Sequence, residues 1–347
     1  MAAKPRLKGI FCPHMVPLDA WGRINEPELR RLVEWLIARG VHGLYPNGSC
    51  GEFTLFTVEE RRRIVEIVVD QAAGRAVVMA GGTEATVDLT LAACEHYAAV
   101  GADCVALVPP YYFKMSQPNV REHFTLLAKH SPIDLVLYNI PQFANEIAVD
   151  TVRELAELPR IIGIKDSSRD FPRYLNTIAA VRPQRPDFSF MIGCEEILVP
   201  SLLMGGDGGT LATSGVVPEI IVGMYQAVVD GRLAEAVRLQ YSVLDLIRTS
   251  VFGAMFPEGM RAAIGCRGFD MGASRTPLAP ESRVDVAQVR SIMERHLADL
   301  GCPLNDGYCA GPAVDRTPPT PLTRTEGSQL DTIVSRVVAQ MLQNGRS

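Results

Sequence analysis

Short apolar runs alternate with longer amphipathic stretches along the first two thirds of the chain. The short runs are rich in β-branched residues, as buried strands are. The stretches between them, such as EPELRRLVEWLIARG and VEERRRIVEIVVDQAAG, have the apolar spacing of amphipathic helices. We predict eight strands, at residues 9–16, 43–46, 76–80, 104–108, 135–139, 161–165, 188–192 and 208–212. Eight repeated βα units predict an α/β fold, a (β/α)8 TIM barrel.

A weak internal repeat supports this barrel. The segments ARGVHGLY, AVGADCVAL and LMGGDGGTL each combine a helix end, a glycine turn and the start of a strand. Strand patterns stop near residue 231, and helical patterns and then a proline-rich segment follow. We therefore predict the barrel over 1–230, a C-terminal helical extension over 231–300, and a Pro-rich arm with a terminal helix over 301–347.

Composition and charge exclude several classes of protein. The 347 residues are 47% hydrophobic and 21% charged, with a formal net charge of −5, so nucleic acid is not an expected partner. No stretch is apolar enough to predict a signal peptide or a membrane span. The eight cysteines are scattered without CxxC spacing, which predicts reduced thiols in a cytoplasmic protein. The six histidines show no ligand spacing, and we expect no metal.

One lysine ends an apolar run in a chain that holds few lysines. Lys165 closes the predicted strand in RIIGIKDSS. Burial disfavours the charged form of an amine, so a lysine in an apolar site offers a neutral nitrogen that attacks carbonyl carbons. Such an amine forms a Schiff base with a ketone. The alternative is structural, with Lys165 paired to Asp166 at the end of the strand.

Other polar residues follow neighbouring strands, where barrel enzymes carry their functional groups. Tyr138 ends the run LVLYNIP, and its phenol is suited to proton transfer, although a strand tyrosine also serves as core packing. The turn that holds Gly48, Ser49 and Cys50 offers backbone N–H groups and a hydroxyl to a carboxylate, or merely connects two elements.

Three motifs together resemble the dihydrodipicolinate synthase and N-acetylneuraminate lyase superfamily of pyruvate-dependent class I aldolases. They are GSCGE, YNIP and GIKDSS, in that order, and the resemblance covers about residues 7–300. It implies that Lys165 forms the Schiff base and that Tyr138 is the general acid/base. It also implies that Ser49 helps to bind the keto-acid carboxylate and relays protons.

The same resemblance assigns further positions. Tyr112 matches a tyrosine that reaches the site of an adjoining subunit in synthases, and Gly193 matches a glycine that opens a substrate-contacting segment. Glu195 and Glu196 resemble the acidic pair that binds sugar hydroxyls in sialic-acid lyases. The alternative is that these glutamates favour a helix N-terminus through its dipole. A homo-oligomer, a tetramer, is implied by the resemblance alone.

Two departures from the family pattern bear on the substrate. Cys50 replaces a second hydroxyl residue and is a weaker donor to a carboxylate. Phe143 stands where synthases carry an arginine that grips the carboxylate of the second substrate, and a phenyl ring makes no such contact.

These observations predict a lyase that cleaves a 2-keto-3-deoxy sugar acid, or a related hydroxy-keto acid, to pyruvate and an aldehyde. The covalent imine on Lys165 needs no cofactor. Three alternatives remain open: a 4-hydroxy-tetrahydrodipicolinate synthase that joins pyruvate to aspartate semialdehyde, a keto-deoxy sugar acid dehydratase, and a non-catalytic keto-acid-binding protein.

Overall fold

Eight parallel strands close into a barrel in the order of the chain. The computed structural model describes residues 7–251, 253 and 255–304. Each strand pairs with the strands before and after it, and the first also pairs with the last. The predicted TIM barrel is confirmed. The strands are β1 (Gly9–Cys12), β2 (Gly43–Leu44), β3 (Val77–Gly81), β4 (Cys104–Leu107), β5 (Asp134–Asn139), β6 (Ile161–Asp166), β7 (Ser189–Ile192) and β8 (Gly208–Thr210).

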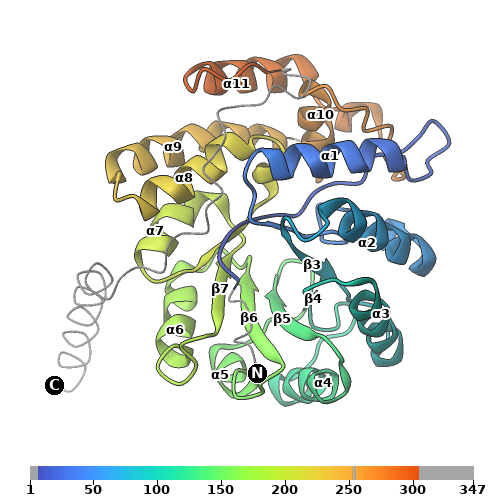
Figure 1. Cartoon of the computed structure of the whole chain (residues 1–347), viewed down its shortest axis with the longest axis vertical. Helices are drawn as coiled ribbons and strands as arrows, with labels where there is room; N and C mark the ends of the chain where they lie inside the picture. Colours follow the sequence, from blue (N-terminus) through green and yellow to red (C-terminus); the bar gives the residue numbers. More distant parts are fainter. Residues whose placement is uncertain (1–6, 252, 254, 305–347) are drawn as a thin grey trace. The chain divides into compact units, whose positions relative to one another are not determined.

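A helix follows every strand, so that the helices form a ring outside the barrel (Figure 1). Short 3-10 turns precede the helix after β2, β7 and β8. The helices of the ring are α1 (Glu26–Ala38), α2 (Val58–Ala72), α3 (Val87–Val100), α4 (Gln117–His130), α5 (Val149–Leu155), α6 (Phe171–Val181), α7 (Leu198–Leu203) and α8 (Pro218–Val229).

Every strand begins within one residue of the predicted start, but five are shorter than predicted, and β1 and β2 lose the largest fraction of their length. The run predicted as 9–16 pairs only to Cys12, and the run 43–46 pairs only to Leu44. Pro13 and Pro46 lack the N–H that a central strand requires, which accounts for the early ends. Met15 and Val16 stay buried outside the ladder, so apolar character alone does not mark a paired residue.

The repeated glycine turn is confirmed. Gly40, Gly101 and Gly205 have φ of 82°, 93° and 99°. Each follows the C-terminal end of a helix in the left-handed region, which side chains other than glycine adopt at a cost. The three segments with similar sequences therefore share the same left-handed glycine turn, which connects a helix to the next strand.

Side chains alternate between the barrel interior and the layer under the helices, because successive residues of a strand point to opposite faces. Lys165 pairs in register with Tyr138 of β5, which belongs to the interior cluster, whereas Asp166 points outward. The Asp166 carboxylate accepts hydrogen bonds from Asn139 (3.0 Å), from the Ser168 backbone N–H (2.8 Å) and from the Arg173 guanidinium. The alternative of a Lys165–Asp166 pair is therefore wrong.

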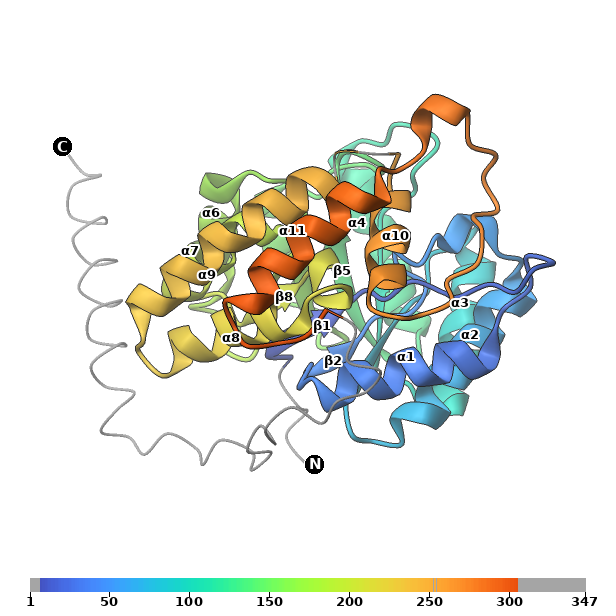
Figure 2. The same ribbon diagram turned by 90° about the horizontal axis from the view of Figure 1, so that it is seen from above.

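Further helices follow the barrel, as the pattern after residue 231 predicted. They are α9 (Leu233–Leu246), α10 (Glu258–Cys266) and α11 (Val286–Ala298), with a π-helical turn (Ile247–Val251) after α9. α9 packs on α8, and α11 packs on α9 and α10 (Figure 2). The boundaries at 230 and 300 stay predictions. Most of the predicted Pro-rich arm and its terminal helix, residues 305–347, lies outside the described residues.

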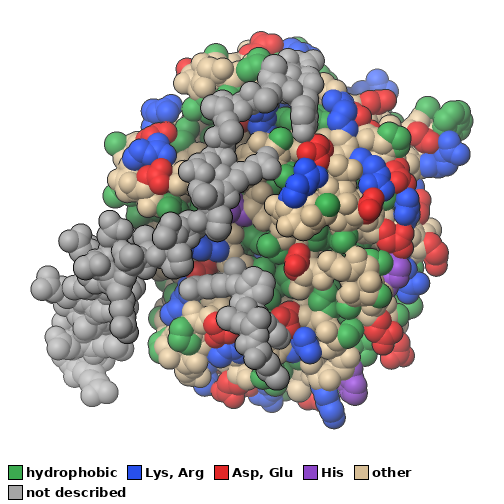
Figure 3. Space-filling model, in the orientation of Figure 1, with side chains coloured by type: hydrophobic (Ala, Val, Ile, Leu, Met, Phe, Trp, Pro, Cys, Tyr) green, Lys and Arg blue, Asp and Glu red, His purple; other side chains and the backbone are tan. Residues whose placement is uncertain are grey.

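Charges of both signs are interspersed on the face drawn in Figure 3, and no broad area of one sign stands out where described atoms are visible. None of the described helices is both long and apolar enough to cross a membrane. Of the eight cysteines, Cys309 lies outside the described residues. Six of the others are free thiols: Cys12, Cys50, Cys94, Cys104, Cys194 and Cys266.

Candidate active site

A cavity of about 240 Å³ opens at the carboxyl ends of the strands, where barrel enzymes place their chemistry. It contains the lysine and the tyrosine that the sequence singled out. The residues that line it are Pro13, Ser49, Cys50, Tyr138, Ile140, Gln142, Phe143, Lys165, Ser167, Arg169, Gly193, Cys194, Glu195, Thr210, Ala212 and Phe256.

Lys165 is buried between two aromatic rings. Its Nζ lies 4.0 Å from the centre of the Tyr138 ring and 4.7 Å from that of Tyr45. The side chain is 4% exposed, and among the described residues no carboxylate lies within ion-pair distance of the amine. The two rings meet edge to face, 6.1 Å apart, so they fix one another as well as the space around the amine.

The turn after β2 brings Ser49 and Cys50 to the same cavity. A side chain at Gly48 would lie 2.9 Å from the Tyr45 ring, so the turn packs closely against one of the aromatic walls. Burial raises the pKa of the Cys50 thiol to about 12, although the nearby Lys165 charge acts in the opposite direction. Cys50 is therefore a protonated thiol at neutral pH, and Ser49 supplies the hydroxyl of this turn.

The segment after β7 contributes Gly193 and Glu195 to the cavity. A Cβ atom at Gly193 would lie 2.0 Å from the Ser167 hydroxyl, so this close approach requires glycine. The Glu195 carboxylate accepts hydrogen bonds from the Thr213 backbone N–H (2.8 Å) and hydroxyl (3.1 Å), and burial raises its pKa. Glu195 thus ties the loop after β7 to the loop after β8.

Glu196 and Tyr112 lie away from the cavity that holds Lys165. Glu196 is not among the lining residues, and one of its oxygens lies 3.7 Å from the Arg169 guanidinium. Tyr112 is 85% exposed and packs edge to face against Phe113. A single chain cannot place Tyr112 in the site of an adjoining subunit, and this role stays a prediction.

Three lining or neighbouring residues escaped the sequence analysis. Tyr45 follows a strand of only two residues, so no alternation marked it as an interior side chain. Arg169 lies in the loop after β6 with a φ of 63°, a left-handed conformation that is uncommon for a residue with a side chain. Thr210 ends β8; it is 1% exposed, and its hydroxyl has no hydrogen-bond partner among the described residues. A buried hydroxyl without a partner is a candidate contact for a substrate oxygen.

A second chamber of about 340 Å³ adjoins the first. Ser49, Ile140, Phe143 and Phe256 line both, so the two spaces share a wall. The remaining residues of the outer chamber are Glu52, Phe53, Thr54, Leu55, Val108, Tyr111, Ala144, Pro257 and Thr276. Phe143, at the position where synthases carry an arginine, therefore borders both the amine-bearing cavity and the chamber outside it.

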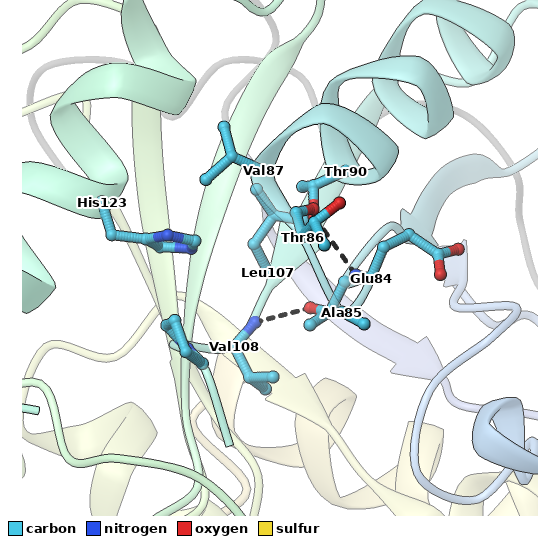
Figure 4. A pocket seen from close by; sticks show the side chains of 10 residues that line it. Glu84, Ala85, Thr86, Val87, Thr90, Leu107, Val108 and His123 are labelled. Carbon is cyan, nitrogen blue, oxygen red and sulfur yellow. Dashed lines mark hydrogen bonds between the residues drawn. The ribbon is translucent and has the colours of Figure 1, made fainter. Parts of the chain in front are cut away.

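A third cavity, of about 240 Å³, lies between α3 and α4 and does not include Lys165 (Figure 4). Two hydrogen bonds join residues that line it. The Val108 N–H donates to the Thr83 hydroxyl (2.9 Å), and the Glu84 N–H donates to the Thr90 hydroxyl (3.2 Å). These bonds close the loops after β3 and β4, which is a structural role.

His14 predicts a pH dependence of stability. Burial lowers the pKa of this fully buried imidazole to about 4, whereas an unfolded histidine titrates near 6.5. Between the two pKa values His14 is protonated in the unfolded chain and neutral in the folded protein. The free energy of unfolding therefore falls as the pH falls through this range. The loss from this residue is about 3 kcal/mol. Urea unfolding at about pH 7 and pH 4.5 should show a smaller drop for His14→Gln than for wild type. An equal drop would contradict this assignment.

The candidate site brings together three polar side chains of different chemistry. A buried amine, a phenol and a serine hydroxyl lie around one cavity. Within the part of the chain that the structure describes, no cluster of three or more His, Cys, Asp or Glu side chains is arranged to hold a metal ion. Fold and site together define the class: a TIM-barrel enzyme with a lysine at the end of β6.

Comparison with known proteins gives the family. The model of the dihydrodipicolinate synthetase family matches residues 6–296. An uncharacterised DapA-like lyase from Halobacterium salinarum is 34% identical over 296 residues, which cover 85% of this chain and 94% of the relative. A 4-hydroxy-tetrahydrodipicolinate synthase from Acidiphilium cryptum is 35% identical over 281 residues, covering 80% and 94%. The chain belongs to the dihydrodipicolinate synthetase family and is a carbon–carbon lyase, as the resemblance implied.

Solved structures of the same family share the fold. YagE, a prophage protein from E. coli K12 in complex with pyruvate, superposes with a TM-score of 0.78 at 28% identity, covering 84% of this chain and 98% of YagE. A 2-keto 3-deoxygluconate aldolase from Picrophilus torridus gives 0.73 at 28% identity, covering 80% and 98%. The relatives thus include both synthases and an aldolase, and the family does not by itself specify the substrate.

Proposed function

We propose that this protein is a Schiff-base-forming aldolase that cleaves a 4-hydroxy-2-keto acid to pyruvate and an aldehyde. The observation that carries the proposal is the pairing of Lys165 with Tyr138 at the bottom of one cavity, on adjacent strands in register. The crystallised relative in complex with pyruvate and the 2-keto 3-deoxygluconate aldolase support it. A 2-keto-3-deoxy sugar acid is one substrate of this type.

Imine formation is the first part of the reaction. The Nζ of Lys165, in its deprotonated form, attacks C2 of the keto acid and gives a carbinolamine. The Tyr138 phenol, whose ring centre lies 4.0 Å from Nζ, gives its proton to the departing hydroxyl, which leaves as water. The products of this step are a protonated imine and a tyrosinate.

Bond cleavage follows from the imine. The tyrosinate takes the proton of the C4 hydroxyl, the C3–C4 bond breaks, and its electron pair moves into the imine to give an enamine and a free aldehyde. Tyr138 then protonates C3. Water attacks C2 and gives a proton back to Tyr138, after which the carbinolamine collapses to pyruvate and the free amine. One water is released and one is consumed, and no oxidant, metal or organic cofactor takes part.

The residues around the amine fit the binding of a small keto acid. Ser49 and Cys50 line the same cavity, and in this proposal the Ser49 hydroxyl and backbone N–H groups of the turn hold the carboxylate. Cys50 lies beside Ser49 as a neutral thiol and contributes a weak donor. Gly193 and Ser167 line the same cavity, and the absence of a side chain at Gly193 lets the Ser167 hydroxyl pack against the backbone there.

A panel of keto acids with product analysis tests the proposal. We expect pyruvate to be released from 4-hydroxy-2-keto acids. Consumption of pyruvate with aspartate semialdehyde would instead establish a synthase, for which the Acidiphilium cryptum relative gives the precedent. Loss of water from a sugar acid without carbon–carbon cleavage would establish a dehydratase, and binding without turnover would establish a keto-acid-binding protein.

We further propose a homo-oligomer, a tetramer, as the functional unit. The aromatic pair Tyr112 and Phe113 is 85% and 76% exposed in the single chain, which suits a surface covered by a neighbouring copy. Light scattering of the purified protein measures the mass directly.

A further inference from the structure

We infer that the aldehyde half of the substrate carries an apolar or aromatic group rather than a chain of hydroxyl groups. This inference rests on the proposed function and specifies its substrate class. The outer chamber of about 340 Å³ shares Ser49, Ile140, Phe143 and Phe256 with the Lys165 cavity. A keto acid bound to Lys165 therefore extends its distal carbons into this chamber or along its wall.

The side chains that line the outer chamber are mainly apolar. Three phenylalanines and a tyrosine line it, together with aliphatic side chains and a proline: Phe53, Phe143, Phe256, Tyr111, Leu55, Val108, Ile140, Ala144 and Pro257. Phe143 is 59% exposed and Tyr111 is 42% exposed. Large aromatic side chains left open at the edge of a catalytic cavity lose water-exposed area when an apolar group binds between them.

The acidic residues contribute little to the lining of the outer chamber. Glu195 lines the Lys165 cavity but not the outer chamber, and its Oε1 accepts two hydrogen bonds from Thr213. Glu196 lines neither chamber. Glu52 is the acidic residue of the outer chamber, and its carboxylate accepts hydrogen bonds from Arg261 and from Ser274 (3.4 Å). The other polar side chains of the outer chamber are the hydroxyls of Ser49, Thr54 and Thr276, and the rest of its lining is mainly apolar. A chain of several hydroxyl groups would therefore leave water for a mainly apolar wall, which costs binding free energy.

The apolar wall is held in place before any ligand binds. The turn Phe53–Leu55 is fixed by two arginines: Arg61 donates to the Phe53 carbonyl (3.2 Å), and Arg275 donates to the Leu55 carbonyl (2.8 Å). Arg61 also forms an ion pair with Glu84, and its side chain is only 11% exposed, so this arginine is itself held in place. A preformed apolar wall favours ligands of matching polarity because little ordering is needed on binding.

Two substrates with the same reacting carbons test the inference. We expect kcat/KM for 4-hydroxy-2-oxo-4-phenylbutanoate, which gives pyruvate and benzaldehyde, to exceed that for 2-keto-3-deoxygluconate by at least about 10-fold. Equal values, or a preference for the sugar acid, would overturn the inference. Borohydride reduction of the wild type with pyruvate separates this failure from a failure of the proposed function, because an adduct on Lys165 shows that imine chemistry is intact whatever the tail preference.

Two variants with the same branched side-chain shape and opposite polarity refine the test. Phe143→Leu keeps the wall apolar, whereas Phe143→Asn makes it polar, and both changes fall on an exposed side chain that the fold does not need for its core. We expect Phe143→Leu to keep most of the preference for the phenyl substrate and Phe143→Asn to reduce it several-fold. An identical preference in both variants would count against contact between this wall and the aldehyde half.

Discussion

Replacing Lys165 with arginine is expected to lower kcat by at least about 10⁴-fold. A guanidinium retains its proton and does not attack a carbonyl, so the imine and everything that follows from it are lost. Losses of this size are usual when a covalent nucleophile is removed. The measurement is the initial rate of pyruvate release from a 4-hydroxy-2-keto acid, together with borohydride reduction in the presence of pyruvate and peptide mass mapping.

Lys129→Arg is the matched control for this change. Lys129 is exposed on α4, outside both chambers, so the same substitution there should leave the rate and the adduct unchanged. In the wild type the adduct should map to the peptide that contains Lys165 and be absent from the Lys165→Arg protein. Turnover by the Lys165→Arg protein at the wild-type rate would disprove the imine mechanism.

Replacing Tyr138 with phenylalanine is expected to lower kcat by about 10²–10⁴-fold, the range for loss of a positioned proton-transfer group. The ring itself remains, so the packing against Tyr45 and Lys165 is kept while the phenol oxygen is lost. Steady-state rates measure the loss, and the borohydride adduct with pyruvate should still form after long incubation. The two variants thus differ: the lysine change removes the adduct, and the tyrosine change slows its formation and its turnover.

Tyr97→Phe is a control for removing a buried phenol. The Tyr97 hydroxyl accepts a hydrogen bond from Asn47 (3.2 Å) outside the Lys165 cavity, and burial raises the pKa of this phenol to about 12. This change should cost some stability and little catalysis. If Tyr138→Phe retained wild-type kcat, Tyr138 would be a packing residue, as a strand tyrosine often is.

The fold was predictable from the sequence because its determinants are local. Apolar runs predicted all eight strands, and the glycine turns predicted how helices return to strands. The ends of β1 and β2 were less predictable, because buried residues such as Met15 continue the apolar pattern into loops above the barrel. Pairing stops at a proline even where burial continues.

The candidate site was predictable only in part, for a physical reason. Lys165 and Tyr138 end apolar runs, which is visible along the sequence, and the structure brings both to one cavity. The partners of the acidic residues are set by contacts distant in sequence, such as Glu195 with Thr213, and no local pattern reveals them. Thr210 likewise became conspicuous only when its hydroxyl proved to be buried without a partner in the described structure.

The Lys165 cavity and the outer chamber are formed by different parts of the fold. Strands β5 and β6 hold the phenol and the amine, and outward-facing Asp166 anchors the second of these strands to α6 through Arg173. The outer chamber comes mostly from loops that follow other strands, such as Phe53–Leu55. Loops accept substitutions that strands of a closed barrel do not. The arrangement is therefore evolvable: selection from loop libraries can reshape the outer chamber while β5 and β6 keep Tyr138 and Lys165 in place.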